Sequence, residues 1–228
     1  MNKKNVKTRE LFSCNTVYLT EFFDSHEYPW EMLPDIGRLA EELLCNPPKG
    51  FKLLSPGILV GEGVTIHESA VLEAPVILGD GCFVRPGAYL RGRVISGRGC
   101  VIGNSTEVKN AILLDHVQIP HYNYVGDSIL GNGAHMGAGA VLSNLKSDGR
   151  PVTVRGEAAY ETGLRKFGAI LGDFADVGCG CVLNPGTVIG KRTSVYPLTS
   201  VRGVVPANCI VKAASNIVER EEIRECAE

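Results

Sequence analysis

A repeat of six residues organises the hydrophobic positions of this chain between Val60 and Val211. An aliphatic residue opens most hexads, and a small or β-branched residue follows it four positions later. This period fits neither an amphipathic helix nor the simple alternation of a strand, but it is typical of hexapeptide parallel β-helices. We therefore expect a triangular prism with three hexads per coil and an aliphatic axis. The opening aliphatics are Val60, Ile66, Leu72, Leu78, Val84, Leu90, Ile102 and Val108, then Leu171, Val177, Leu183, Ile189, Val195 and Val201.

Glycine occupies the second position of many hexads. A residue without Cβ suits places where the backbone turns sharply, so these glycines are interpreted as corners of the prism. They are Gly61, Gly79, Gly97, Gly103, Gly131, Gly137, Gly172, Gly178 and Gly190.

The first 55 residues have a different pattern. Residues 7–46 contain most of the aromatic side chains, and apolar residues recur at helical spacing from Leu33 to Leu44 before Pro47 and Pro48 end the pattern. We interpret residues 1–55 as a small helical cap that covers the open N-terminal end of a prism formed by residues 56–212. Within residues 213–228, a short helix from about Ser215 is expected to cover the other end.

Composition limits the classes of function. The chain has 228 residues, of which 44% are hydrophobic, with a net charge of -2 and a pI near 6.2. This balance provides no basic field for nucleic acid. No apolar stretch follows the N-terminal lysines, and no run is long enough to span a bilayer, so we expect a cytoplasmic protein without membrane contact.

The cysteines are expected to be reduced and buried. There are 8 of them, no C-x-x-C motif occurs, and Cys82, Cys100 and Cys181 occupy small positions of the repeat. This pattern indicates neither a disulfide framework nor a zinc site.

The repeat is broken in two ways. The spacing contracts to five residues between Val108 and Leu113, and again between Val125 and Leu130. It then stops altogether over residues 143–170. Breaks in a regular scaffold often re-aim side chains at functional sites, and loops of this length inside a compact domain are usually functional.

Motifs around these breaks carry a resemblance to a known family. The motifs are Arg85-Pro-Gly-Ala, Glu107-Val-Lys, His121 followed by Tyr124-Val-Gly-Asp, and Gly137-Ala-Gly with Asn144 after it. Together they resemble the acetyltransferase domain of bifunctional N-acetylglucosamine-1-phosphate uridyltransferases, over roughly residues 79–206. The family's uridyltransferase domain has no counterpart in these 228 residues, so pyrophosphorylase activity is not expected.

The resemblance implies both a fold and a reaction. The fold is a left-handed β-helix, an exception to the usual right-handed crossover, and the assembly is a homotrimer with sites between subunits. The reaction transfers the acetyl group of acetyl-CoA to the 2-amino group of glucosamine 1-phosphate. We accordingly expect an amino-sugar phosphate of this type as acceptor and acetyl-CoA as donor, without a metal.

His121 is the candidate general base. An ammonium group must lose a proton before it attacks a thioester, and a histidine titrates in the appropriate pH range. The resemblance assigns this role to the histidine of the H-x-x-Y-x-G-D motif. Counting hexads also predicts that His121 stacks one coil away from Ala138, next to the expected donor channel.

The phosphate of the acceptor requires cations. Lys109 holds the position of a family residue that contacts the acceptor, and an arginine can bind phosphate through two parallel hydrogen bonds. Arg85 carries the family's motif but lies 24 residues before Lys109, whereas Arg91 lies 18 residues before it, which is one full coil. Both arginines remain candidates.

The remaining site residues also follow from the resemblance. Four positions depart from the family: His135 replaces an asparagine, Leu145 a tyrosine, Cys179 a serine and Pro197 an alanine. The expected acceptor-binding residues are Arg85, Arg91, Lys109, Tyr124 and His135. The expected donor-binding residues are Ala138, Asn144, Lys166, Cys179 and Pro197.

Two other classes of function remain open. His116 and His121 have a spacing that resembles the ligands of γ-class carbonic anhydrases, with His67 or His135 as a third ligand. Alternatively, the prism is a catalytically silent scaffold or sugar-phosphate sensor associated with a nucleotidyltransferase.

Overall fold

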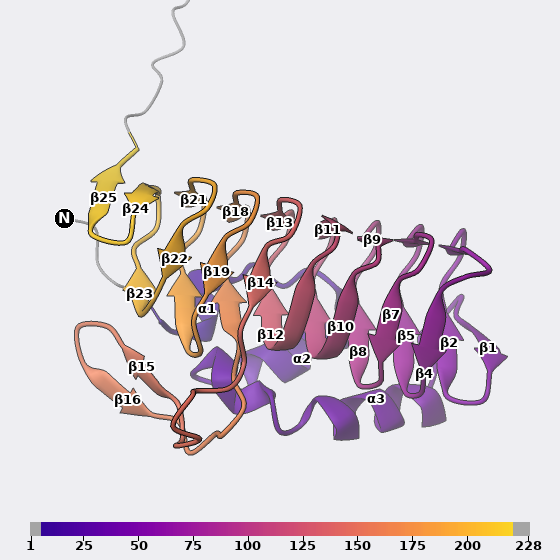
Figure 1. Cartoon of the computed structure of the whole chain (residues 1–228). Helices are drawn as coiled ribbons and strands as arrows, with labels where there is room; N and C mark the ends of the chain where they lie inside the picture. Colours follow the sequence, from indigo (N-terminus) through magenta and orange to yellow (C-terminus); the bar gives the residue numbers. More distant parts are fainter. Residues whose placement is uncertain (1–5, 221–228) are drawn as a thin grey trace, which may run out of the picture.

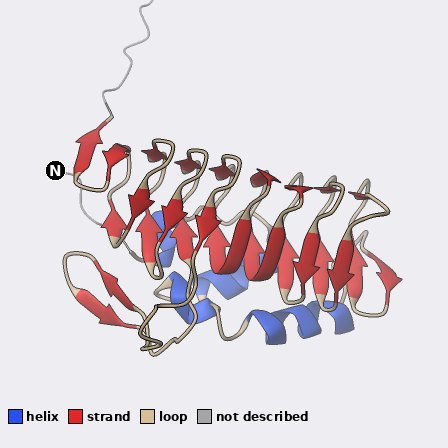
Figure 2. Ribbon diagram, viewed as in Figure 1, coloured by secondary structure: helices blue, strands red, loops and turns tan. Residues whose placement is uncertain are grey.

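The computed structural model describes residues 6–220 and shows a left-handed parallel β-helix with helices along one side (Figure 1). Figure 2 shows that strands dominate the molecule and that the helices are confined to one layer. The mainly-β fold predicted from the hexads is therefore confirmed. No helix in this part of the chain is long and apolar enough to cross a bilayer.

Short strands build three flat faces of the prism. The first face contains β2 (Ile58–Val60), β5 (Val76–Leu78), β8 (Val94–Ser96), β17 (Ala169–Leu171), β20 (Thr187–Ile189) and β23 (Val204–Val205). The second contains β3 (Thr65–Ile66), β6 (Phe83–Val84), β9 (Val101–Asn104), β11 (Gln118–His121), β13 (His135–Met136), β18 (Asp176–Val177), β21 (Ser194–Val195) and β24 (Cys209–Ala213). The third contains β4 (Val71–Glu73), β7 (Tyr89–Arg91), β14 (Val141–Leu142), β19 (Val182–Leu183) and β22 (Ser200–Val201).

The two contracted hexads correspond to two long strands that turn a corner of the prism. Strands β10 (Glu107–Leu113) and β12 (Tyr124–Leu130) begin in the third face and end in the first. Their coils are 17 residues long, because Lys109 pairs with Gly126, whereas Val76 pairs with Val94 at the regular 18. Each of these coils is one residue shorter than a regular coil, and the shortening occurs at this corner.

Aliphatic side chains fill the axis of the prism, as the hexads predict. Val84, Leu90, Ile102 and the equivalent residues of other coils form one continuous buried cluster. Four cysteines are buried in the described chain, namely Cys82, Cys100, Cys181 and Cys209. The expectation of burial is wrong for Cys45 and Cys179, which are exposed, and for Cys14, which is half-buried.

The repeat glycines have a role different from the predicted one. None of the nine has a positive φ, so they do not provide left-handed corners. They are needed because successive coils approach closely at these positions. A Cβ on Gly103, for example, would overlap the carbonyl group of Pro120 in the next coil.

The N-terminal helices do not cover the end of the prism, which corrects the expectation from the sequence. They are α1 (Thr8–Leu11), α2 (Val17–Asp24), η1 (Pro29–Met32) and α3 (Ile36–Cys45), and they lie along the first face (Figure 1). The cause is a second apolar row, which points outward from that face and is buried beneath the helices. The row consists of Leu59, Ile77, Ile95, Ile112, Ile129, Ile170, Val188 and Val204.

Antiparallel strands end the prism on both sides. Strand β1 (Lys52–Ser55) pairs with β2, and β25 (Asn216–Glu219) pairs with β24. The helix expected from Ser215 is therefore wrong over residues 216–219, because pairing with the last coil satisfies the backbone of this segment. The rest of that expected helix, residues 221–228, lies outside the described residues.

The insertion after Ser143 is partly ordered as a hairpin of β15 (Thr153–Arg155) and β16 (Ala159–Glu161). Aromatic rings attach it to the helical layer. The Trp30 ring lies 5.6 Å from that of Tyr160 and 6.3 Å from that of Phe167, measured between ring centroids. The aromatic N-terminal segment thus holds the insertion in place.

Candidate active site

His121 stands in a column of residues along the edge between the second and third faces. The amide of Gly139 donates to the His121 carbonyl at 3.0 Å, and the amide of Gly180 donates to the Ala138 carbonyl at 2.8 Å. The column continues one coil further, from Cys179 to Pro197. The structure therefore places His121 and Ala138 one coil apart, as the hexad count predicts. All four members of the column are exposed.

Two of the three candidate phosphate-binding residues, Arg91 and Lys109, lie on the third face. Val108 pairs with Leu90, so Lys109 and Arg91 are neighbours on adjacent coils. The Arg91 guanidinium is paired with Glu107 at 2.6 Å. Arg85 lies elsewhere, after β6 at the end of the second face, with its guanidinium over the Phe83 ring. Within one chain, the structure brings Arg91 next to Lys109 and does not bring Arg85 there.

The pKa of Lys109 is lowered from its ordinary value. Partial burial is the largest cause, and the positive charges of Lys166 and Arg91 act in the same direction, against the attraction of Asp127. A bound anion would relieve this repulsion.

A buried polar network supports the third-face site. The Asn144 side-chain nitrogen donates to the Tyr124 hydroxyl at 3.1 Å and to the Asp127 carboxylate at 2.6 Å. Asn110 donates to the other oxygen of Asp127 at 3.0 Å. Burial raises the pKa of Tyr124, so its phenol stays protonated at neutral pH. Because the Tyr124 oxygen accepts from Asn144, its own hydrogen is free to donate.

Backbone conformation places the two buried members of this network. Asn110 and Asp127 follow each other on adjacent coils at the corner where β10 and β12 turn, with φ of 47° and 49°. Asparagine and aspartate tolerate this left-handed conformation better than most residues. Asn110 also donates to the carbonyl of Leu33 at 3.2 Å, which connects the site to the helical layer.

Both ends of the insertion are fixed at this network. The Gly168 amide donates to the Asp127 carbonyl and the Phe167 amide to the Asn144 carbonyl, each at 2.9 Å. Leu145 and Lys166 form an isolated antiparallel bridge between the two ends. This arrangement brings Asn144 and Lys166 to the same side of the prism as Lys109.

His135 lies apart from this group within one chain. It is on β13 in the second face, where its Nδ1 pairs with Asp176 at 2.8 Å. The sequence assigned it to the acceptor site, and the fold gives it a carboxylate partner instead.

The histidines do not form a metal-ligand cluster within one chain. His116 lies in the turn before β11, and His121 is the last residue of β11. Among residues 6–220, no group of three or more His, Cys, Asp or Glu side chains is placed to hold a metal ion.

Two contributors were missed from the sequence, Asn110 and Glu107. The signal was present: Glu107-Val-Lys-Asn110 and Tyr124-Val-Gly-Asp127 are equivalent segments, one contracted coil apart. Asn110 and Asp127 occupy the same position of these two segments, at the contracted corner, and this repetition of a polar residue indicates a buried, hydrogen-bonded pair.

Comparisons with known proteins agree with the resemblance found in the motifs. The family described as GMPPB C-terminal domain matches residues 73–162. The bifunctional protein GlmU of Methanococcus vannielii is 36% identical over 110 residues, which are 48% of this chain and 24% of that protein. The chain thus spans about a quarter of the length of such relatives.

Two further proteins have related sequences or structures. A putative uncharacterized acetyltransferase of Escherichia coli, YaiX, is 36% identical over 150 residues, or 65% of each chain. The crystal structure of PerB from Caulobacter crescentus, in complex with CoA and GDP-perosamine, aligns with a TM-score of 0.40 and 22% identity over 64% of this chain and 52% of that one.

Proposed function

We propose that this protein is an acyl-CoA-dependent N-acetyltransferase whose acceptor is an amino-sugar phosphate of the glucosamine-1-phosphate type. The observation that supports it most is that a candidate base and two cations are associated with the third face of the prism. His121 and Ala138 form a column on the edge that this face shares with the second face, and the cationic pair Arg91 and Lys109 lies on the third face itself. A base at one edge of this face and an anion site on it suit an acceptor that carries both an amine and a phosphate.

Each group then has a role in the transfer. His121 removes a proton from the ammonium group, and the amine nitrogen forms a bond with the acyl carbon of the thioester. The carbon–sulfur bond breaks, CoA leaves as a thiol after taking up the proton from His121, and the amide nitrogen releases its remaining extra proton to water. Lys109 and Arg91 bind the phosphate of the acceptor, and the free hydrogen of Tyr124 donates to its sugar.

Along the column, small residues and backbone groups provide the path for the donor. Ala138, Cys179 and Pro197 are exposed on successive coils, and their short side chains leave room for an extended acyl-CoA arm. Lys166 and Asn144 approach from the insertion. These residues are proposed donor contacts.

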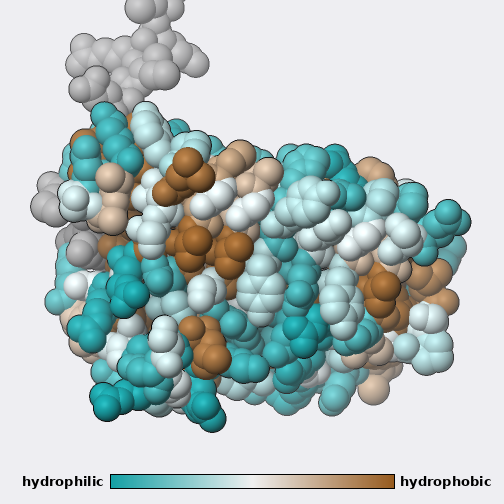
Figure 3. All heavy atoms as spheres, in the orientation of Figure 1, coloured by the Kyte–Doolittle hydropathy of each residue, from teal (hydrophilic) through white to brown (hydrophobic). Residues whose placement is uncertain are grey.

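A homotrimer is part of the proposal. The helical layer buries the first face, so a second copy can meet only the second and third faces, whose shared edge carries His121. Exposed apolar residues beside that edge, among them Tyr122, Val182 and Leu198, would be covered in such an assembly. Figure 3 shows hydrophobic groups scattered over an otherwise hydrophilic side of the molecule.

Thiol release from acetyl-CoA tests the proposed function. The purified chain is incubated with acetyl-CoA and a panel of amino-sugar phosphates and nucleotide-linked amino sugars, with unphosphorylated glucosamine as control. We expect acceptor-dependent thiol release that is strongest with a phosphorylated amino sugar. Failure to bind acetyl-CoA would support a silent scaffold instead.

A further inference from the structure

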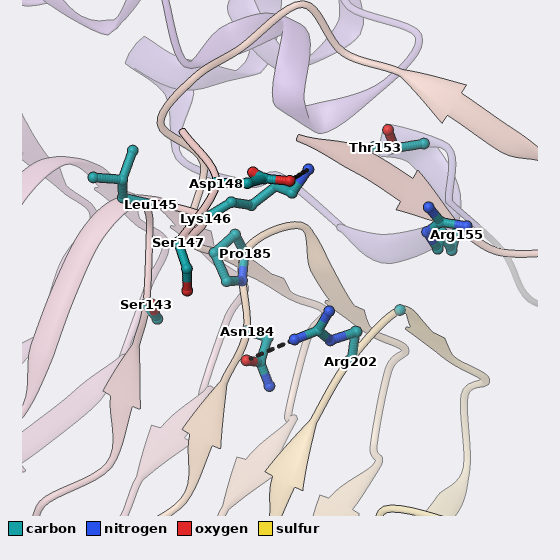
Figure 4. A pocket seen from close by; sticks show the side chains of 11 residues that line it. Ser143, Leu145, Lys146, Ser147, Asp148, Thr153, Arg155, Asn184, Pro185 and Arg202 are labelled. Carbon is teal, nitrogen blue, oxygen red and sulfur yellow. Dashed lines mark hydrogen bonds and ion pairs between the residues drawn. The ribbon is translucent and has the colours of Figure 1, made fainter. Parts of the chain in front are cut away.

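A separate cavity of about 310 Å³ lies between the insertion and the last coils of the prism. Figure 4 shows its lining, with Lys146 and Arg155 from the insertion opposite Asn184 and Arg202 from the prism. This volume is at the lower end of the range for small-molecule pockets. His121 and Lys109 do not line it, so it is distinct from the proposed active site.

The cavity is rich in positive charge. Lys146, Arg155 and Arg202 line it, against a single carboxylate, Asp148, which pairs with Lys146 at 3.3 Å. In the described part of the chain, no carboxylate lies within ion-pair distance of Arg155 or Arg202. The lining therefore has two guanidinium groups whose charge is not offset.

The prism positions one side of this lining firmly. The Ser143 amide donates to the Leu183 carbonyl, and the Asn184 amide donates to the Val201 carbonyl, each at 2.9 Å, so Ser143, Asn184 and Arg202 follow one another on adjacent coils. The Asn184 side chain accepts from the Arg202 guanidinium at 3.4 Å. An arginine held by a neutral partner keeps its charge available for a ligand.

The other side is formed by the insertion and is also held. Its hairpin contributes Arg155 and the hydroxyl of Thr153, and the aromatic contact between Tyr160 and Trp30 attaches that hairpin to the helical layer. Two separate guanidinium groups thus face one space from two elements, and the Thr153 hydroxyl beside them donates to Glu161 at 3.1 Å. Guanidinium groups recognise phosphate through paired, charge-assisted hydrogen bonds.

We propose that this cavity binds a phosphate group of a small ligand, with Arg155 and Arg202 as its principal contacts. A volume of about 310 Å³ exceeds the needs of a single phosphate, since a water molecule takes about 30 Å³. The ligand is therefore a phosphate with an attached group, such as a phosphorylated nucleoside.

The position of the cavity leaves two sources for this phosphate. On the third face, four coil steps of about 4.8 Å lead from Lys109 through Gly126, Ser143 and Asn184 to Arg202, about 19 Å in total. An extended molecule that reacts near His121 could reach the cavity with its distal end. That end is either the adenosine phosphate part of an acyl donor or the nucleotide part of an acceptor.

Calorimetric titration of the full chain tests the proposal. Adenosine 3′,5′-bisphosphate and uridine diphosphate are titrated separately, with adenosine and uridine as unphosphorylated controls. We expect one of the two phosphorylated compounds to bind. Arg155→Gln and Arg202→Gln should each raise its dissociation constant about tenfold to a hundredfold. Arg150→Gln, which removes an insertion arginine outside the lining, should leave the dissociation constant unchanged.

The results separate this site from the proposed catalysis. Binding of the bisphosphate assigns the cavity to the donor, and binding of the diphosphate assigns it to a nucleotide-linked acceptor. Neither titration requires acyl transfer, so an inactive protein that binds either compound still supports the site. The proposal is overturned if neither compound binds in the millimolar range, or if the two lining variants weaken binding no more than Arg150→Gln.

Discussion

Asn144 and Asp127 are joined by a hydrogen bond of 2.6 Å between the side-chain amide of the first and the carboxylate of the second. Asn144 belongs to the start of the insertion, and Asp127 to a buried corner of the prism. The same amide also contacts the Tyr124 hydroxyl. This relationship fixes the insertion, the corner and a candidate substrate-binding side chain in one network.

Asp127→Ala should destabilise the protein by about 2–4 kcal/mol, because it leaves the amide groups of Asn110 and Asn144 without their acceptor in a buried place. Urea unfolding measures the loss. Asp176→Ala is the matched control, since this exposed carboxylate also accepts a side-chain hydrogen bond, and it should cost at most about 0.5 kcal/mol. Equal effects of the two variants would contradict the structural role of the network.

The hexads predicted the prism because its interior depends on one repeated rule, an aliphatic residue at each inward position. They did not reveal which face is covered. The signal was the runs of successive apolar residues in the first face, such as Val76, Ile77 and Leu78, in which the middle residue must point outward. An outward Ile77 requires a covering layer along the face, and the N-terminal helices provide it.

The sequence predicted which residues stack on adjacent coils where position along the repeat is sufficient. His121 and Ala138 are related by coil count alone, and so are Arg91 and Lys109. The sequence could not show the partner of His135, because Asp176 lies 41 residues later, beyond an insertion of irregular length. It also could not show the cavity near Arg202, which depends on how that insertion folds back.

Measuring acceptor binding distinguishes whether Arg91 or Arg85 binds the phosphate. Arg91→Ala should raise the dissociation constant of an amino-sugar phosphate about tenfold to a hundredfold, because the guanidinium lies beside Lys109. Arg85→Ala should change it far less. Isothermal titration with donor absent measures both constants. A larger effect of Arg85→Ala would show that the family motif, and not the coil count, identifies the phosphate-binding arginine.

Lys109→Met should weaken acceptor binding at least tenfold without destabilising the unliganded protein. The pKa of Lys109 is lowered by burial and by neighbouring cations, so the folded state binds its proton less readily than the unfolded state. The charge therefore costs stability at pH 7, and this cost disappears as pH rises through the folded pKa. Methionine keeps much of the apolar stem. Unfolding in urea at pH 7 should give a free energy equal to or above that of the wild type, and a clear decrease would contradict this account.

Trp30→Ala should release the insertion while the prism stays folded. The indole is buried between Tyr28, Tyr160 and Phe167, so its loss removes the contact that attaches the hairpin to the helical layer. We expect faster trypsin cleavage after Arg155 and Arg165, which mass spectrometry of the fragments would detect. Tyr196→Ala, at an exposed aromatic residue, is the control. Unchanged cleavage in Trp30→Ala would show that other contacts hold the insertion.

The most direct test of the central claim compares acceptor-dependent thiol release from acetyl-CoA by the wild type, His121→Asn and His135→Asn. The account predicts a loss of about 10²-fold or more in turnover for His121→Asn, with acetyl-CoA binding retained. It predicts a much smaller loss for His135→Asn, because His135 lies on the second face beside Asp176. Near-full turnover by His121→Asn, together with a large loss in His135→Asn, would contradict it.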